Sequence, residues 1–367
     1  MYPTISHFIE DLFGIFIPLP IQTFGFFVAL AFLLASWTLS LELKRKEEEG
    51  ILEVFIQKKI IGIKATPWQL LYAAIFGFLI GFKLIESIFY YNDLVANPQE
   101  FILSLRGNFL GGFLGAIFYS FKKYRDFAKQ DLPEPKMIKE KIRPYEIVGD
   151  ITLLAAAAGL LGAKIFHNLE NIDAFLADPL GQLLSFSGLT FYGGLICGAT
   201  VVIWYGKKHN IHYTHIADAV APGLMLAYGV GRLGCHFAGD GCWGVFNSCD
   251  IPEQISFLPD WIWHYDYKNA VVGAPGGLVY PTAIYESIMA ILLFSFLWII
   301  RKRITIPGML FGIYLIVNGL ERFIIEKIRV NTTYNIFGNE ITQAEIISSL
   351  LIITGLGIVI YLKRLKN

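Results

Sequence analysis

The sequence predicts an all-α, polytopic membrane helix bundle of about nine transmembrane helices. Hydrophobic residues make up 55% of the 367 positions and charged residues only 16%, whereas an ordinary soluble domain is about 25% charged. The 35 glycines agree with this class, because glycine is more frequent in membrane helices than in soluble ones. The formal net charge is zero, which argues against nucleic acid as a partner.

A spanning helix needs about 20 mostly apolar residues. Residues 1–20 lack the basic start and the cleavage site of a signal peptide, so we expect them to lie on the surface before the first span. Nine later stretches qualify as spans, and the third is the shortest: 21–41, 67–90, 107–121, 145–166, 185–205, 216–234, 280–300, 308–326 and 345–363.

Every second connection between these stretches is rich in Lys and Arg. The basic side chains fall within residues 44–64, 122–143, 207–208, 301–303 and 363–366. Because positively charged connections stay on the cytoplasmic side, the sequence predicts an amino terminus outside and a cytoplasmic carboxyl terminus. An odd number of spans satisfies both ends.

The chain forms a single membrane domain, 1–367, whose largest outward loop is 235–279, a periplasmic segment. Cys235, Cys242 and Cys249 lie in or beside it, in an oxidising compartment, and we expect one disulfide there, between Cys242 and Cys249. The Cys-x6-Cys-x6-Cys spacing lacks the short ligand spacing of zinc sites. We therefore expect no metal and no other cofactor.

Residues 67–121 look like an inserted helix pair that resembles 145–205. Lys83 matches Lys164 and Pro98 matches Pro179, each 81 positions apart. A duplicated pair would offer an extra wall or a surface for a protein partner, whereas convergent glycine-rich packing would explain the same pattern. Parallel repeats also occur in transporters, which keeps a small-solute transporter as an alternative.

Ionisable side chains inside a membrane cost roughly 2.5 to 3.5 kcal/mol each at a helix centre, so their positions carry information. The expected orientation places several at the outer membrane face: Arg232, Tyr285, Glu286, Arg322 and Glu326. A second set ends two other spans on the same side: Lys83, Glu86, Lys164 and His167. For Lys83, Lys164 and His167, snorkelling of the side chains to the interface is at least an equally good explanation.

Arg232 stands in a glycine-rich run, 231–244, directly after an apolar helix. Glycine allows close backbone approach or positive φ, and a guanidinium can grip a phosphate with two hydrogen bonds. Together with Arg322 from another helix, Arg232 predicts a clamp for an anionic lipid head group. The alternatives are a tight exit turn with an interfacial Arg232 and a simple ion pair of Arg322 with Glu326, four residues on.

Four motifs, in this order, resemble the prolipoprotein diacylglyceryl transferases of bacterial inner membranes. They are residues 189–195, 228–244, 280–286 and 322–326. The resemblance covers residue 145 to the end plus the first span, and 67–121 lies outside it.

The resemblance implies a multi-pass protein of the bacterial inner membrane. It implies transfer of a diacylglyceryl group from phosphatidylglycerol to the cysteine thiol of a prolipoprotein signal peptide, with release of glycerol phosphate. The substrate-binding residues it implies are Arg232, Arg322, Gly193, Gly194, Gly231, Gly234, Gly239, Gly244, Cys235, Tyr285 and Glu286. The catalytic candidates are Tyr192, Asp240 and Glu326.

The chain departs from the family pattern at several positions. Tyr192 stands where the family has a His, and Cys235 where it has an Asn. Other replaced positions are Phe24, Tyr280 and Asn318. A tyrosine, with a reference pKa of about 10, is a poor base near neutrality, so Asp240 or Glu326 would have to act instead. A non-catalytic lipid- or lipoprotein-binding subunit is the main alternative to an enzyme.

Overall fold

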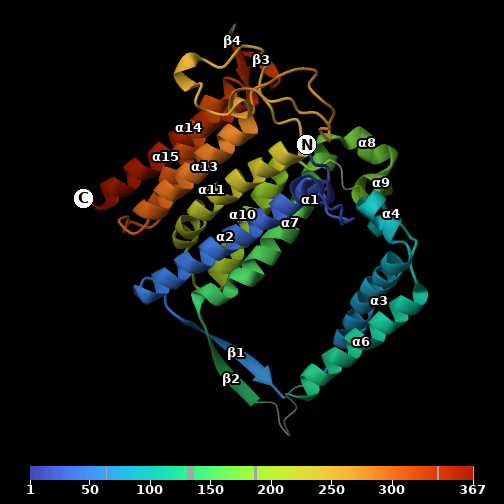
Figure 1. Ribbon diagram of the computed structural model, residues 1–367. Coiled ribbons are helices and arrows are strands. Elements are labelled where there is room, and N and C mark those ends of the chain that lie inside the picture. Colours follow the sequence, from blue (N-terminus) through green and yellow to red (C-terminus); the bar gives the residue numbers. More distant parts are fainter. Residues whose placement is uncertain (63, 130–135, 186–187, 337–338, 367) are drawn as a thin grey trace.

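The computed structural model describes residues 1–367 except 63, 130–135, 186–187, 337–338 and 367. Within the described residues, a long helix occupies each of the nine expected stretches (Figure 1). These helices are α2 (Thr23–Glu48), α3 (Pro67–Phe89), α6 (Phe109–Ala128), α7 (Val148–Glu170), α10 (Phe191–Lys208), α11 (Tyr213–Ala238), α13 (Thr282–Ile300), α14 (Met309–Glu326) and α15 (Gln343–Lys366). Five of them, α2, α3, α7, α13 and α15, are long and apolar enough to cross a membrane. The all-α polytopic class is confirmed. The number of nine membrane-spanning helices stays a prediction.

Two helix ends differ from the expected boundaries. Helix α10 begins at Phe191 rather than at 185, and residues 186–187 of that expected span lie outside the described residues. Helix α11 runs to Ala238, past the expected end at 234, because Cys235, His236 and Ala238 are buried and extend its packed face. The first half of the glycine-rich run is therefore helical.

Helix α11 is the centre of the bundle, where it packs against α2, α13 and α14. One buried cluster joins α2, α7 and α11 through Leu43, Ile151 and Ile216. A second joins α11, α13 and α14 through Met225, Ala290 and Leu310. This packing fixes the ends of α11, α13 and α14 close to one another.

Two helix pairs share one order of elements. Helices α3 and α6 are joined by α4 (Tyr91–Ala96) and α5 (Pro98–Leu103), and helices α7 and α10 by α8 (Ile172–Ala177) and α9 (Pro179–Leu184). In each pair a glycine of the first helix meets one of the second. A Cβ added at Gly81 would lie 2.1 Å from the Gly111 carbonyl oxygen, and one added at Gly162 would lie 2.5 Å from that of Gly193.

The two matching lysines close the matching loops. Lys83 Nζ donates to Ser104 Oγ at 3.1 Å, and Lys164 Nζ donates to Ser185 Oγ at 2.8 Å, each 21 residues further on. Lys164 is buried. Its ammonium group therefore serves the loop of its own pair, and snorkelling to the interface does not describe it.

A two-stranded ribbon joins the first two basic connections. Strand β1 (Phe55–Ile61) pairs antiparallel with β2 (Lys136–Ile142), and Lys58 lies opposite Lys139. The ribbon places both connections on the same side of the molecule, as the charge pattern requires. A second hairpin, β3 (Thr333–Ile336) with β4 (Asn339–Thr342), lies between α14 and α15.

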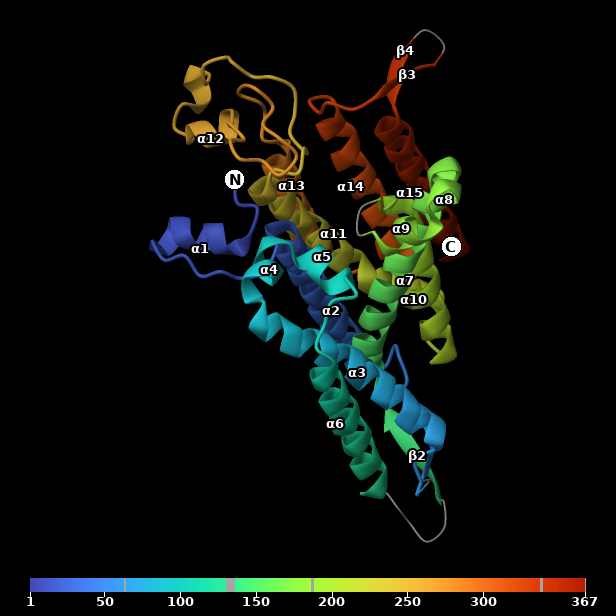
Figure 2. The same cartoon turned by 90° about the vertical axis from the view of Figure 1, so that its right-hand side faces the viewer.

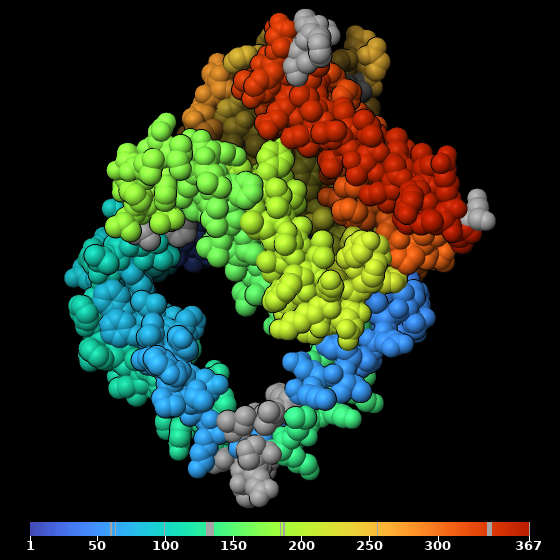
Figure 3. Space-filling view, turned by 180° about the vertical axis from the view of Figure 1, so that it is seen from behind, coloured from blue at the N-terminus to red at the C-terminus, as the bar shows by residue number. Residues whose placement is uncertain are grey.

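The α3/α6 pair stands away from the bundle. Figure 1 shows it apart from α2 and α7, and Figure 2 shows both of its helices extending toward the end of the molecule that carries β2. In the space-filling view an opening lies between the pair and the bundle (Figure 3). The β1/β2 ribbon bridges one end. At the other end the hydroxyl of Tyr91 donates to the Pro18 carbonyl at 2.5 Å, close to the short helix α1 (Ile5–Phe13). Large apolar side chains of the pair, such as Leu79 and Phe113, are exposed, as expected for a surface that faces lipid.

Candidate functional site

Three arginines converge on the carboxylate of Glu286, in the first turns of α13. The Glu286 side chain is 0% exposed, so these ion pairs are shielded from water. Arg232 Nε lies 2.8 Å and Arg322 NH1 lies 3.5 Å from the same oxygen, Oε2. Arg329 NH1 lies 2.5 Å from Oε1. The structure thus brings Arg232 of α11 and Arg322 of α14 together, as the predicted clamp requires, and we call Arg232, Arg322 and Arg329 the arginine cluster.

Further side chains hold this cluster in place. Arg322 NH2 also pairs with Glu326, 2.9 Å away, and Asn331 Nδ2 donates to Glu326 Oε1 at 2.7 Å. The hydroxyl of Tyr228 donates to Glu286. Arg322 therefore pairs with Glu326 and lies close to Arg232 at the same time. A simple ion pair and a clamp for an anionic head group do not exclude each other.

Two donors of the cluster have unused hydrogen-bonding capacity. Arg322 NH1 and Arg329 Nε are buried and form no hydrogen bond with a described residue. A buried donor without an acceptor costs about 1–3 kcal/mol. A phosphate oxygen is a charged acceptor that would satisfy both guanidinium groups. The arrangement is thus chemically suited to an anionic ligand.

The glycine-rich run reverses the chain at the end of α11. Gly239 and Gly241 have φ of +70° and +74°, a conformation that side chains other than glycine rarely adopt. Gly231, in contrast, would meet no atom within 4 Å with an added Cβ, so close packing does not require glycine there.

Two other glycines of the run allow close packing. An added Cβ at Gly234 would lie 2.7 Å from Phe27 Cβ, and one at Gly244 would lie 2.4 Å from the Ile328 carbonyl oxygen. The backbone N–H of Gly244 donates to the Tyr280 carbonyl at 2.8 Å. These contacts fix the turn between the start of α13 and the end of α14, beside the arginine cluster.

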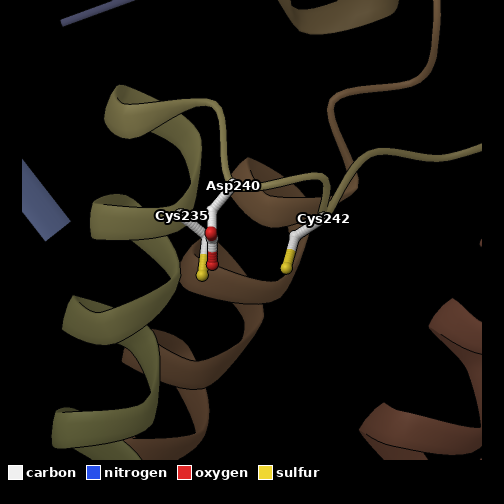
Figure 4. A group of neighbouring side chains, drawn as sticks. All are labelled: Cys235, Asp240 and Cys242. Carbon is white, nitrogen blue, oxygen red and sulfur yellow. The ribbon is translucent and has the colours of Figure 1, made fainter. Parts of the chain in front are cut away.

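The turn carries Cys242 to the cluster. Arg232 NH1 donates to Cys242 Sγ at 3.4 Å. A hydrogen bond from Cys235, together with the charges of Arg232 and Arg329, lowers the pKa of Cys242 below its usual value. Burial raises the pKa of Asp240, against the opposing charge of Arg232. Sγ of Cys235, a carboxylate oxygen of Asp240 and Sγ of Cys242 all lie within 4.8 Å of one another (Figure 4).

The expected disulfide between Cys242 and Cys249 is wrong, because all four cysteines are unpaired. The reversed turn points Cys242 toward Arg232 and Cys235. Cys249 is exposed, beyond the point where Gly244 is fixed to Tyr280, and its carbonyl accepts a hydrogen bond from Trp263 Nε1 at 3.1 Å.

The remaining expected residues lie around this centre. Tyr285 donates its hydroxyl to the Ile262 carbonyl at 2.5 Å, in the short helix α12 (Asp260–Trp263), and so holds the outer loop on α13. Tyr192, on α10, is 37% exposed and within electrostatic range of Arg322. Gly193 and Gly194 pack against α7, where an added Cβ would lie 2.5 and 3.1 Å from carbonyl oxygens. Their predicted role in substrate binding stays a prediction.

The sequence interpretation missed Arg329, Tyr228 and Glu321 as members of this centre. Arg329 lies three residues beyond Glu326, so a charge just past a helix end deserved the same weight as one inside it. Glu321 is buried beside Tyr228, within electrostatic range of Glu286 and Arg232.

Comparison with known proteins finds relatives for most of the chain. Residues 127–361 match the prolipoprotein diacylglyceryl transferase family, so α3 and nearly all of α6 lie outside the match. The phosphatidylglycerol–prolipoprotein diacylglyceryl transferase of Dehalococcoides mccartyi is 29% identical over 224 residues, 60% of this chain and 78% of the relative. The enzyme of that name from Vibrio vulnificus is 34% identical over 220 residues, 58% of this chain and 74% of the relative. The enzyme of that name from Shouchella clausii is 27% identical over 219 residues, which are 59% of this chain and 76% of the relative. By this match, the chain belongs to the prolipoprotein diacylglyceryl transferase family.

Proposed function

We propose that this protein transfers a diacylglyceryl group from phosphatidylglycerol to the cysteine thiol of a prolipoprotein signal peptide, at the outer face of the bacterial inner membrane. The observation that carries the proposal is the arginine cluster at Glu286, in a chain of this family. The names of the relatives support the choice of substrates.

The reaction concentrates negative charge on the leaving phosphate. The acceptor's thiolate sulfur attacks the glyceryl carbon, the bond from that carbon to the phosphate oxygen breaks, and the electron pair leaves with glycerol phosphate. Positioned guanidinium groups stabilise such charge as it develops. Arg232 and Arg322 are the residues we assign to this role, and Arg329 extends the same positive surface.

The catalytic candidates differ in what surrounds them. Glu326 is engaged with Arg322 and Asn331, so we assign it to positioning Arg322. The Tyr192 hydroxyl, on α10, forms no hydrogen bond within the part of the chain that the structure describes. Asp240 is exposed and lies beside two cysteines, within electrostatic range of Arg232.

We also propose that α3/α6 is a duplicate of α7/α10. The common order of elements, the glycine contacts and the matched lysine–serine hydrogen bonds support this origin. The pair adds a second wall of exposed apolar side chains, such as Leu79 and Phe113, outside the bundle. A protein partner on that wall stays a prediction.

The test is reconstitution of the purified protein with phosphatidylglycerol and a lipobox peptide. We expect a thioether-linked product by mass spectrometry and an equal amount of glycerol phosphate. Arg232→Ala and Arg322→Ala should each slow the reaction by about 10²–10³-fold, the usual effect of removing one such donor. Arg232→Lys keeps the charge but loses the planar fork, and should fall between the wild type and Arg232→Ala.

Product formation no higher than in protein-free liposomes would overturn the enzyme proposal. If the protein then still retained phosphatidylglycerol, with less retained by Arg232→Ala, the lipid-binding subunit would be the better description.

A further inference from the structure

Three potential metal ligands meet where the glycine-rich turn folds back onto α11. Cys235 comes from the last turns of the helix, and Asp240 and Cys242 from the turn that follows. Figure 4 shows the three side chains extending side by side in the same direction. The sequence expectation of no metal rested on the spacing to Cys249, which does not take part. The group that the fold assembles is Cys235, Asp240 and Cys242.

The three ligand atoms suit zinc in type and in spacing. Thiolate sulfur and carboxylate oxygen are both common zinc ligands, and thiolates favour zinc over harder cations. At a Zn–S distance of about 2.3 Å, tetrahedral ligands lie about 3.8 Å apart. The observed atoms lie within 4.8 Å of one another before any metal binds. Rotation of Asp240, which is exposed, and of Cys242, which is half-buried, would close that gap.

The surrounding charge suits a bound zinc ion. Two thiolates and one carboxylate carry three negative charges. With Zn²⁺ bound, the site therefore keeps one net negative charge. The guanidinium of Arg232, whose NH1 lies 3.4 Å from Cys242 Sγ, offsets that remaining charge. A charged hydrogen bond to a ligand atom is also the kind of outer contact that orients metal ligands.

A site with three protein ligands leaves its fourth position open, which is the arrangement of catalytic rather than structural zinc. The group that must react in the proposed function is a thiol, with a reference pKa of about 8.5, and only its thiolate attacks well. A thiol that coordinates zinc is deprotonated by the metal. Zinc here would supply the thiolate without a general base.

We propose that Cys235, Asp240 and Cys242 bind Zn²⁺ and that the acceptor's cysteine thiol binds as the fourth ligand. The metal site itself is independent of the proposed function, whereas its role in activating the thiol rests on that function. On binding, the thiol proton passes to water. The zinc-bound sulfur then attacks the glyceryl carbon, the carbon–oxygen bond to the phosphate breaks, and glycerol phosphate leaves with the electron pair and takes up a proton. The thioether formed is a weaker ligand and departs.

The first experiment measures metal binding alone, on the full chain purified in detergent. After loading with ZnCl₂ and dialysis, we expect about one zinc per chain by elemental mass spectrometry, as three ligands permit. Cys242→Ser and Asp240→Asn should each weaken zinc binding at least tenfold. Cys249→Ser removes an exposed cysteine outside the group and should leave binding unchanged. Zinc binding that is absent, or equal in wild type and Cys242→Ser, would overturn the site. So would a Cys235–Cys242 disulfide in protein taken directly from membranes under non-reducing conditions.

The second experiment tests the fourth ligand. In protein loaded with Co²⁺, a lipobox peptide should increase the thiolate-to-cobalt charge-transfer absorption, and the same peptide with serine in place of its cysteine should not. Removal of zinc by a chelator should slow transfer at least a hundredfold, and added zinc should restore it. Full activity without zinc would overturn the activating role. Zinc bound by a protein that transfers nothing from phosphatidylglycerol would instead contradict the proposed function and leave the metal site intact.

Discussion

Glu286 allows the three positively charged guanidinium groups of the arginine cluster to lie together at a buried site. Arg232, Arg322 and Arg329 would repel one another in the low dielectric of the bundle, and the carboxylate supplies an opposite charge to each of them. Such pairs add little net stability when intact, because desolvation of the charges offsets their attraction. Loss of one partner is far more costly, since it leaves an uncompensated charge inside.

Glu286→Gln is therefore expected to destabilise the fold strongly. The neutral amide keeps the shape of the side chain but leaves three guanidinium groups without their shared counter-charge, a loss of about 3–5 kcal/mol in the free energy of unfolding. Thermal unfolding in detergent measures the effect. Glu345→Gln is the control, because its partner Lys327 is largely exposed, and it should cause little change. Equal unfolding temperatures for the two variants would contradict this account of Glu286.

Some of the centre could be predicted at the level of residues. Arg232 and Arg322 stood out because a charge within an apolar helix is rare and needs a reason. The position of Cys242 could not be predicted, because it depends on how the loop after α11 folds back onto the helix end. The same cause explains the wrong disulfide: distance along the sequence said nothing of the turn at Gly239 and Gly241.

At the level of elements, hydropathy predicted the presence of the long helices. It did not predict the residues at which they end. Apolar stretches of membrane length leave the backbone no alternative to a helix. The end of α11 depends instead on whether residues 235–238 find a packed surface, which a sequence pattern does not reveal. The β1/β2 ribbon also escaped prediction, because its strands are joined by contacts far apart in the chain.

Within the α3/α6 pair, Gly81→Ala is expected to destabilise the protein by about 1–3 kcal/mol, the usual cost of overpacking. The new methyl group would lie 2.1 Å from a carbonyl of the facing helix, so the two backbones must separate. Gly149→Ala is a matched control on α7, because an added Cβ there meets no atom within 4 Å. Thermal unfolding of both variants provides the measurement. A Gly81→Ala protein as stable as Gly149→Ala would show that close approach at Gly81 is not needed.

For the molecule as a whole, the charge pattern and the ribbon support the same orientation. The ribbon joins two basic connections on one side, and the arginine cluster lies at the ends of helices that face the other way along the bundle (Figure 1). The overall class could be predicted from composition alone. The separation of the α3/α6 pair from the bundle could not, because hydropathy does not distinguish a helix that faces lipid from one that faces protein.

Labelling in right-side-out membrane vesicles tests this orientation. Cys249 is exposed on the outward loop and should react with a membrane-impermeant maleimide in intact vesicles. Lys139→Cys, on the exposed part of β2, should react only after the vesicles are permeabilised. Mass spectrometry of the labelled peptides distinguishes the two sites. Reaction of the introduced cysteine in intact vesicles would reverse the predicted topology.

The buried carboxylate at the arginine cluster has a consequence for turnover. An entering phosphate must compete with Glu286 for the same guanidinium groups, so part of its attraction is spent in loosening ion pairs that already exist. When glycerol phosphate leaves, those pairs re-form and favour its departure. We expect an internal anion of this kind to keep the head group and the spent product only briefly bound, so that the site is emptied for the next lipid.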